Sequence, residues 1–120
     1  MLLMGAQDIE LDLFGHLVTV VLDEAYFEYV ERDDYPDGVQ MLVDHRNLIV
    51  TRTFSKIYGL AGLRIGYSVT SVEFADLMNR IRQPFNVNHV AQVAATAALD
   101  DTEHLSRVIQ MTDQGKQRVY

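Results

Sequence analysis

The stretch Thr53-Phe-Ser-Lys-Ile-Tyr-Gly-Leu-Ala-Gly-Leu-Arg-Ile-Gly-Tyr67 places one lysine, Lys56, between hydroxyl side chains and a glycine-rich turn that ends in an arginine. Before it lies Asn47-Leu-Ile-Val-Thr-Arg-Thr-Phe54, a β-branched run bounded by polar residues. This run predicts a buried strand that delivers Lys56 at its carboxyl end. In open α/β sheets, ligands bind at that end of the strands. The sequence therefore predicts an α/β fold with Lys56 at the ligand-binding edge.

Lys56 itself allows two interpretations. A lysine at a strand end is most often a solvated amine. Alternatively, a partly desolvated amine beside another cation is a nucleophile that forms Schiff bases. The neighbours favour the second interpretation, because Thr53 and Ser55 offer hydroxyl groups and Arg64 can grip a phosphate with two hydrogen bonds. These residues suit an aldehyde cofactor that carries a phosphate.

Composition limits the possible functions. The chain has 120 residues, enough for one domain at most, and 48% of them are hydrophobic. The formal net charge of −7 argues against nonspecific binding to nucleic acid or anionic membranes. The apolar run Leu17–Leu22 is too short to span a membrane, and residues 1–15 lack a basic leader. With no cysteine, the sequence favours a cytoplasmic protein without disulfides.

No metal site is predicted. The histidines, His16, His45, His89 and His104, are scattered and no two of them have the spacing of a zinc motif. Five acids lie near a surface connection between residues 29 and 38, but they lack calcium-loop spacing and are typical of a solvated face. They are Glu28, Glu31, Asp33, Asp34 and Asp37.

A second predicted strand precedes the lysine segment. The run Leu17–Leu22 has the pattern of a strand buried on both faces of a parallel sheet, and it stops at Asp23. Asp23 either caps a turn or contacts a ligand, while Glu24 either supports the structure or is solvated. A short helix expected over Val39–His45 then implies a right-handed parallel crossover to the lysine strand.

The remaining chain predicts one strand and three helices. The run Ile65–Val69 alternates as a strand does, and Thr70 or Ser71 can cap a helix that ends near Arg82, before Pro84. That helix is expected to place four apolar side chains in the core: Phe74, Leu77, Met78 and Ile81. Further helices are expected over Val90–Leu99, with Asn88 as a possible cap, and over Glu103–Gln117.

Three motifs in this order carry a resemblance to a known family. The segment Ser55–Gly66, the motif Asp23-Glu-Ala-Tyr26 and the segment Arg82–Asn88 resemble those of the fold-type I pyridoxal-phosphate enzymes, aminotransferase class I/II, and the last is similar to the histidinol-phosphate aminotransferases. The resemblance implies that residues 1–87 are part of the large cofactor-binding domain, built on a mostly parallel sheet with flanking helices. Residues 88–120 would be a helical segment that leads toward the small domain.

The resemblance also implies a role for each site residue. Lys56 would be the catalytic residue, which forms an aldimine with pyridoxal 5'-phosphate and transfers protons. Asp23 would pair with the protonated pyridine nitrogen, Ala25 would pack on the ring and Tyr26 would bond the ring hydroxyl. The phosphate would be held by Thr53, Ser55 and Arg64.

The implied reaction is a transamination in histidine biosynthesis, from histidinol phosphate and 2-oxoglutarate to imidazole acetol phosphate and glutamate, in a homodimer. Two alternatives stay open. A related decarboxylase of a phosphorylated amino acid shares the lysine and aspartate motifs. The chain also lacks the family's upstream glycine-rich phosphate cup and its downstream substrate-binding arginine, so it resembles a fragment, and an inactive truncated domain is the other alternative.

Overall fold

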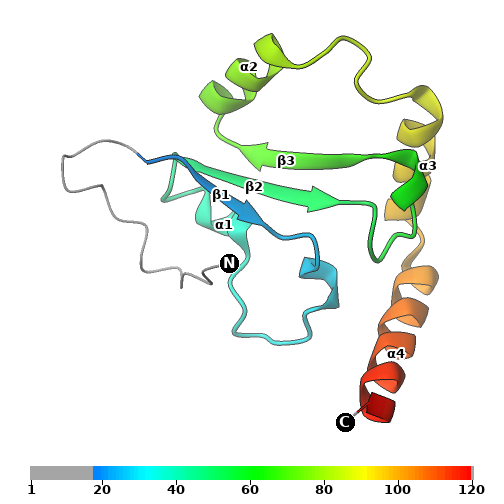
Figure 1. Ribbon diagram of the computed structural model, residues 1–120. Helices are drawn as coiled ribbons and strands as arrows, with labels where there is room; N and C mark the ends of the chain where they lie inside the picture. Colours follow the sequence, from blue (N-terminus) through cyan, green and yellow to red (C-terminus); the bar gives the residue numbers. More distant parts are fainter. Residues whose placement is uncertain (1–17, 120) are drawn as a thin grey trace.

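A computed structural model describes residues 18–119 and places a three-stranded sheet at the centre of these residues (Figure 1). The strands are β1 (Val20–Asp23), β2 (Leu48–Thr53) and β3 (Gly66–Thr70), in the order β1-β2-β3. β1 pairs with β2 in parallel, whereas β3 pairs with β2 antiparallel. The α/β fold is confirmed, but in the described part of the chain only one of the two strand pairings is parallel.

The central strand β2 organises the core. Its residues alternate between the two faces, and Leu48 and Val50, which share one face, are 1% and 0% exposed. Phe54 and Ile57, just beyond the strand, are also buried. The predicted buried strand before Lys56 is therefore confirmed.

The connection from β1 to β2 contains little regular structure. The 3-10 helix η1 (Phe27–Tyr29) is followed by a mostly exposed segment and by α1 (Gly38–Met41). Asp37 caps α1, because its carboxylate accepts a hydrogen bond from the Val39 N–H at 2.9 Å. The expected helix over Val39–His45 is too long at its end. Between Leu42 and His45 the backbone continues mainly with hydrogen bonds to the third residue before, which are those of turns, and His45 N–H also donates to the Met41 carbonyl, four residues before.

The expectation of a first strand buried on both faces is wrong for β1, while Leu17 lies outside the described residues. Val21 is 60% exposed and Asp23 is also exposed, because one face of the sheet is left uncovered within residues 18–119. We call this side the open face and define it by Val21, Asp23, Thr51 and Thr53. Leu22, Val50 and α1 lie on the opposite, covered face.

α2 (Val72–Ile81) has Ser71 as its cap and ends before Arg82, as the sequence predicts. The Ser71 hydroxyl accepts a hydrogen bond from the Phe74 N–H, and the helix stops before Pro84. The predicted core stripe is wrong for Leu77 and Ile81, which are 54% and 84% exposed, whereas Phe74 and Met78 are half-buried. The helix flanks the edge strand β3 (Figure 1). Ala75 and Met78 line a pocket between this helix and that strand.

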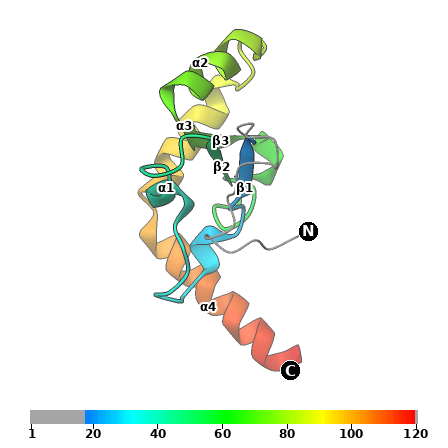
Figure 2. The same ribbon diagram turned by 90° about the vertical axis from the view of Figure 1, so that its left-hand side faces the viewer.

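The chain ends in α3 (His89–Leu99) and α4 (Thr102–Val119). Asn88 caps α3 as predicted, because its side chain accepts a hydrogen bond from the Ala91 N–H at 2.8 Å. Both views show α3 beside the sheet and α4 running away from it (Figures 1 and 2). Among the described residues, no helix is long and apolar enough to cross a membrane.

Candidate active site

Lys56 lies in a loop that is fixed at both sides of the lysine. Phe54 and Ile57 are buried, while the Lys56 side chain between them is exposed. The loop is closed by hydrogen bonds from Gly59 N–H to the Lys56 carbonyl and from Leu60 N–H to the Phe54 carbonyl, both 2.9 Å. Gly59 has a φ of +70°, a conformation that suits glycine. The backbone therefore presents Lys56 at the carboxyl end of β2.

The structure brings Lys56 together with Tyr26. The Lys56 Nζ atom lies 5.2 Å from the centroid of the Tyr26 ring, within the range of a cation–π interaction. Tyr26 follows β1 and is 60% exposed, so residues from two neighbouring strands meet here. The partial desolvation expected of a Schiff-base lysine is not supplied by residues 18–119, because Lys56 remains exposed among them.

Asp23 ends β1 on the open face. Its Oδ1 atom accepts a hydrogen bond from the Ala25 N–H at 3.1 Å and another from the Thr51 hydroxyl at 3.4 Å. The first of these is the turn-capping contact that the sequence allowed. Asp23 thus caps the turn that leads to Ala25 and Tyr26, and it also presents a carboxylate at the same strand edge as Lys56.

The predicted phosphate-binding residues are brought together only in part. The Thr53 hydroxyl oxygen accepts a hydrogen bond from the Ser55 N–H at 3.0 Å. Arg64 follows the 3-10 helix η2 (Ala61–Leu63), has a left-handed φ of 53°, and donates to the Ala61 carbonyl at 2.8 Å. Within residues 18–119, no hydrogen bond joins Arg64 to Thr53, Ser55 or Lys56. The Ile65 carbonyl nevertheless accepts a hydrogen bond from the Phe54 N–H. This bond places Arg64, the residue before Ile65, near the carboxyl end of β2.

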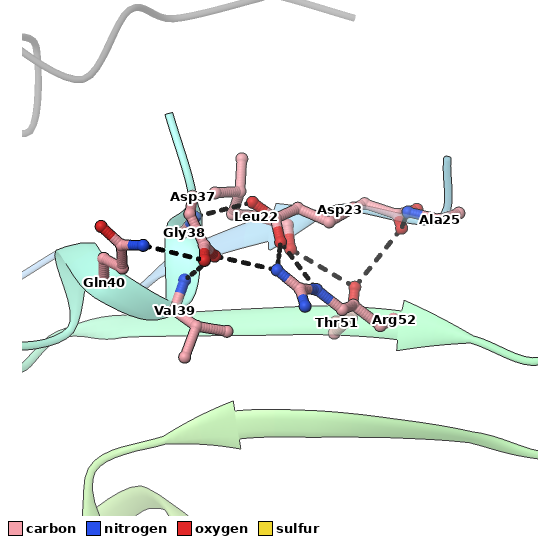
Figure 3. A network of polar contacts seen from close by, with 10 residues as sticks. Leu22, Asp23, Ala25, Asp37, Gly38, Val39, Gln40, Thr51 and Arg52 are labelled. Atoms are coloured by element: carbon pink, nitrogen blue, oxygen red, sulfur yellow. Dashed lines mark hydrogen bonds and ion pairs between the residues drawn. The ribbon is translucent and has the colours of Figure 1, made fainter. Parts of the chain in front are cut away.

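An ion pair that the sequence did not predict lies behind the site, on the covered face. Glu24 is 3% exposed, so the interpretation of a solvated side chain is wrong. Arg52 donates to Glu24 Oε2 through Nε and Nη2, at 2.9 and 2.8 Å, and Nη2 also reaches Asp37 Oδ1 at 2.9 Å. Figure 3 shows the Arg52 guanidinium between β2 and the start of α1.

Two further contacts complete this network. The Gly38 N–H donates to Glu24 Oε1 at 2.8 Å, and the Arg52 guanidinium lies 3.9 Å from the centroid of the Phe27 ring. Burial acts to lower the pKa of Arg52, but the hydrogen bonds and charge of Glu24, together with a smaller effect of Tyr67, outweigh it, so this pKa lies above its ordinary value. A sequence signal existed, because Arg52 interrupts an otherwise uncharged strand and Glu24 directly follows the neighbouring one.

The remaining acids do not gather into a metal site. No group of three histidine or acidic side chains suited to a metal ion occurs in the part of the chain that the structure describes. Asp34 instead pairs with Arg32, whose hydrogen bond lowers the pKa of that carboxyl group. Asp37 belongs to the buried network with Arg52.

Comparison with known proteins adds a family match. The family Aminotransferase class I and II matches residues 13–119. Histidinol-phosphate aminotransferase 2 of Methylococcus capsulatus is 58% identical over 104 residues, which cover 87% of this chain and 28% of that protein. Histidinol-phosphate aminotransferase 1 of Nitrosococcus oceani is 62% identical over 90 residues, which cover 75% of this chain and 24% of that protein. The chain therefore spans about a quarter of the length of these curated relatives.

Solved structures of pyridoxal-phosphate and related enzymes also match this chain. The crystal structure of histidinol-phosphate aminotransferase from Sinorhizobium meliloti, in complex with pyridoxal-5'-phosphate, matches with a TM-score of 0.75 and 42% identity. The match covers 82% of this chain and 27% of that one. L-threonine-O-3-phosphate decarboxylase from Porphyromonas gingivalis matches with a TM-score of 0.61 and 27% identity, over 72% of this chain and 26% of that one.

Proposed function

Because this chain belongs to the class I and II aminotransferase family, we propose that it carries the lysine segment of a pyridoxal-phosphate-dependent transaminase. The proposed reaction converts histidinol phosphate and 2-oxoglutarate to imidazole acetol phosphate and glutamate in the cytoplasm. The observation that carries the proposal is the meeting of β1 and β2 residues at one strand edge, where the Lys56 amine lies 5.2 Å from the Tyr26 ring. The histidinol-phosphate aminotransferases at 58% and 62% identity support this substrate class.

The residues at this edge fit the chemistry of the cofactor. A primary amine can bond an aldehyde, and the Asp23 carboxylate can balance a protonated ring nitrogen. Thr53, Ser55 and Arg64 supply hydroxyl and guanidinium donors for a phosphate. Ala25 would pack on the ring, and the Tyr26 hydroxyl would bond to the ring oxygen.

Each residue then has a proposed task. When bound, pyridoxal phosphate supplies an aldehyde that condenses with amines and a ring that accepts electron density. The Lys56 Nζ atom would hold the cofactor until the amino group of the substrate displaces it. The freed amine would then accept a proton from the substrate carbon as a general base and donate it to the cofactor carbon as a general acid. Asp23 and Tyr26 orient the ring. Because Lys56 is exposed among residues 18–119, we further propose that other segments or a second copy exclude water from the site.

The test is covalent capture of Lys56. The purified chain is incubated with pyridoxal phosphate, reduced with borohydride and mapped by mass spectrometry, with Lys116 as the internal control. The hydrogen bond to Asp113 raises the pKa of Lys116, so less of the Lys116 amine is neutral and reactive. This effect alone would favour labelling of Lys56 over Lys116 by any aldehyde. The experiment is therefore repeated with Asp113→Asn and with pyridoxal, which lacks the phosphate. Selective capture of Lys56 that depends on the phosphate supports the proposal, whereas equal labelling of both lysines contradicts it.

A phosphorylated amino-acid decarboxylase is the second candidate, favoured by the match to the threonine-phosphate decarboxylase structure. Product analysis separates the two functions. Glutamate formed from 2-oxoglutarate in equal amount with a phosphorylated keto product identifies the transaminase. Release of carbon dioxide from threonine phosphate identifies the decarboxylase.

The proposal includes a homodimer. A second copy would complete a site that lies open on the uncovered side of the sheet. Light scattering coupled to size-exclusion chromatography measures the mass in solution, and the monomer mass of 13.7 kDa at all concentrations would contradict a dimer of this chain.

A further inference from the structure

We propose that Arg52 and Glu24 are positioning residues for the candidate active site. Their buried ion pair fixes the ends of β1 and β2 from the covered face, and thereby places Asp23 and the Lys56 loop on the open face. The inference rests on the proposed function only for the identity of the site residues. Whether the ion pair on one face of the sheet holds the residues on the other face can be tested without cofactor.

The register of β1 and β2 determines which residues lie on each face of the sheet. Asp23 pairs with Thr51 across β1 and β2, and their side chains are in contact on the open face. Asp23 is followed in the chain by Glu24, and Thr51 is followed by Arg52. Because successive side chains of a strand point to opposite faces, the ion pair lies directly behind the Asp23–Thr51 contact.

The ion pair is built to hold its geometry. The side chains of Arg52 and Glu24 are 14% and 2% exposed, and both carboxylate oxygens of Glu24 accept hydrogen bonds. Arg52 also reaches Asp37 at the start of α1. Because Arg52 is the cation that pairs with the buried Glu24 carboxylate, moving the two side chains apart would leave that carboxylate buried without compensation, which is costly. It joins the end of β1, the end of β2 and the start of α1.

Short backbone connections lead from this pair to the site. The Glu24 N–H donates to the Thr51 carbonyl at 2.9 Å, one residue before Arg52. On β2, Arg52 is followed by Thr53, whose hydroxyl holds the Ser55 N–H beside Lys56. On β1, Glu24 lies between Asp23 and Ala25, whose N–H is held by Asp23. A shift of the ion pair must therefore move both groups of site residues.

Amide hydrogen exchange, followed residue by residue by NMR in the chain without cofactor, tests this coupling. The variants are Arg52→Lys, which keeps the charge but loses the forked geometry, and Glu24→Gln, which keeps the shape but loses the charge. The matched control is Arg32→Lys, because Arg32 also donates through Nε and Nη2 to a carboxylate, that of Asp34, but on the exposed surface. The reference amide is that of Ala95, which is buried in α3.

We expect both network variants to accelerate exchange at Ala25 and Ser55 by about tenfold or more, the change produced by about 1.4 kcal/mol of lost local stability. Ala95 should change less, and Arg32→Lys should change none of these amides. Acceleration confined to Gly38, or equal acceleration at Ala95, overturns the proposal, since the pair would then be local to α1 or only a source of global stability.

A double-mutant cycle on cofactor affinity adds a second readout. If the pair acts through Asp23, Arg52→Lys weakens pyridoxal phosphate binding in the parent chain and has a smaller effect in the Asp23→Asn background. Equal effects in both backgrounds contradict positioning of Asp23. A chain that binds no pyridoxal phosphate at all contradicts the proposed function of this chain, while the exchange experiment still decides the coupling.

Discussion

The Nε2 atom of His104 in α4 lies 2.9 Å from the carbonyl oxygen of Ile57, the residue that follows Lys56. A carbonyl oxygen only accepts hydrogen bonds, so Nε2 must carry the proton and donate it. The two residues are 47 positions apart in the chain, and their contact attaches the C-terminal helix to the lysine loop. Gly59 lies in the same contact region, where an added Cβ atom would come within 3.9 Å of His104 Nε2.

His104→Ala should lower the free energy of unfolding by about 1–3 kcal/mol, because the Ile57 carbonyl would lose its donor. His104→Gln should recover part of this loss, since its amide can donate from a similar position. Urea unfolding measures both variants, with the exposed His89→Ala as the control. Equal losses for the alanine and glutamine variants would show that the hydrogen bond is not the cause.

Gly38→Ala should lower the free energy of unfolding by about 1–3 kcal/mol through overpacking. An added Cβ atom would lie 2.6 Å from Leu22 Cδ2 and 2.7 Å from Glu24 Oε1, and the Glu24 carboxylate is held in place by Arg52. Thermal or urea unfolding checks this. The opposite sign is expected for Gly115→Ala in α4. Apart from its own helix backbone, an added Cβ atom would have no neighbour within 4 Å among the described residues, and alanine is the better helix former by about 0.5–1 kcal/mol.

Arg64→Ala should weaken pyridoxal phosphate binding by about 1.5–3 kcal/mol, the usual worth of a hydrogen bond to a charged group. Pyridoxal, which lacks the phosphate, should bind the variant and the parent chain alike. Alanine keeps a Cβ atom at this left-handed position, so the backbone cost at a φ of 53° is nearly unchanged. Equilibrium dialysis with both ligands gives the comparison, and an equal loss for the two ligands would remove Arg64 from the phosphate site.

Stability should fall at alkaline pH in a way that depends on Tyr58. Burial, followed by the negative charge of Glu28, raises the pKa of this half-buried phenol above its ordinary value of 10.0. One Glu28 oxygen is buried without a hydrogen-bond partner among the described residues. Because the folded state holds the phenolic proton more tightly, this stabilisation is complete below the ordinary pKa and is lost as pH rises through the raised one.

Urea unfolding of the parent chain and Tyr58→Phe across this pH range tests the effect. The variant should lose less stability than the parent as the pH rises. Identical slopes would mean that Tyr58 does not contribute to the alkaline transition.

The sequence predicted those features whose cause is local. The strand before Lys56, the caps Ser71 and Asn88, and the end of α2 before Pro84 follow from β-branched runs, side-chain acceptors and a missing N–H, which act within a few residues. The family also followed from short motifs in a fixed order, and the match over residues 13–119 confirms it.

The tertiary structure decided which faces are covered. Hydrophobic patterns mark one side of α2, and the run of β1 before Asp23, as apolar. Ile81 and Val21 are nevertheless exposed, because burial depends on whether another element lies against that side. The same holds for Glu24 and Arg52. Glutamate and arginine usually lie at the surface, so the residue types alone give no reason to pair them. Only the parallel register of β1 and β2 brings these two together in a buried pair behind Asp23.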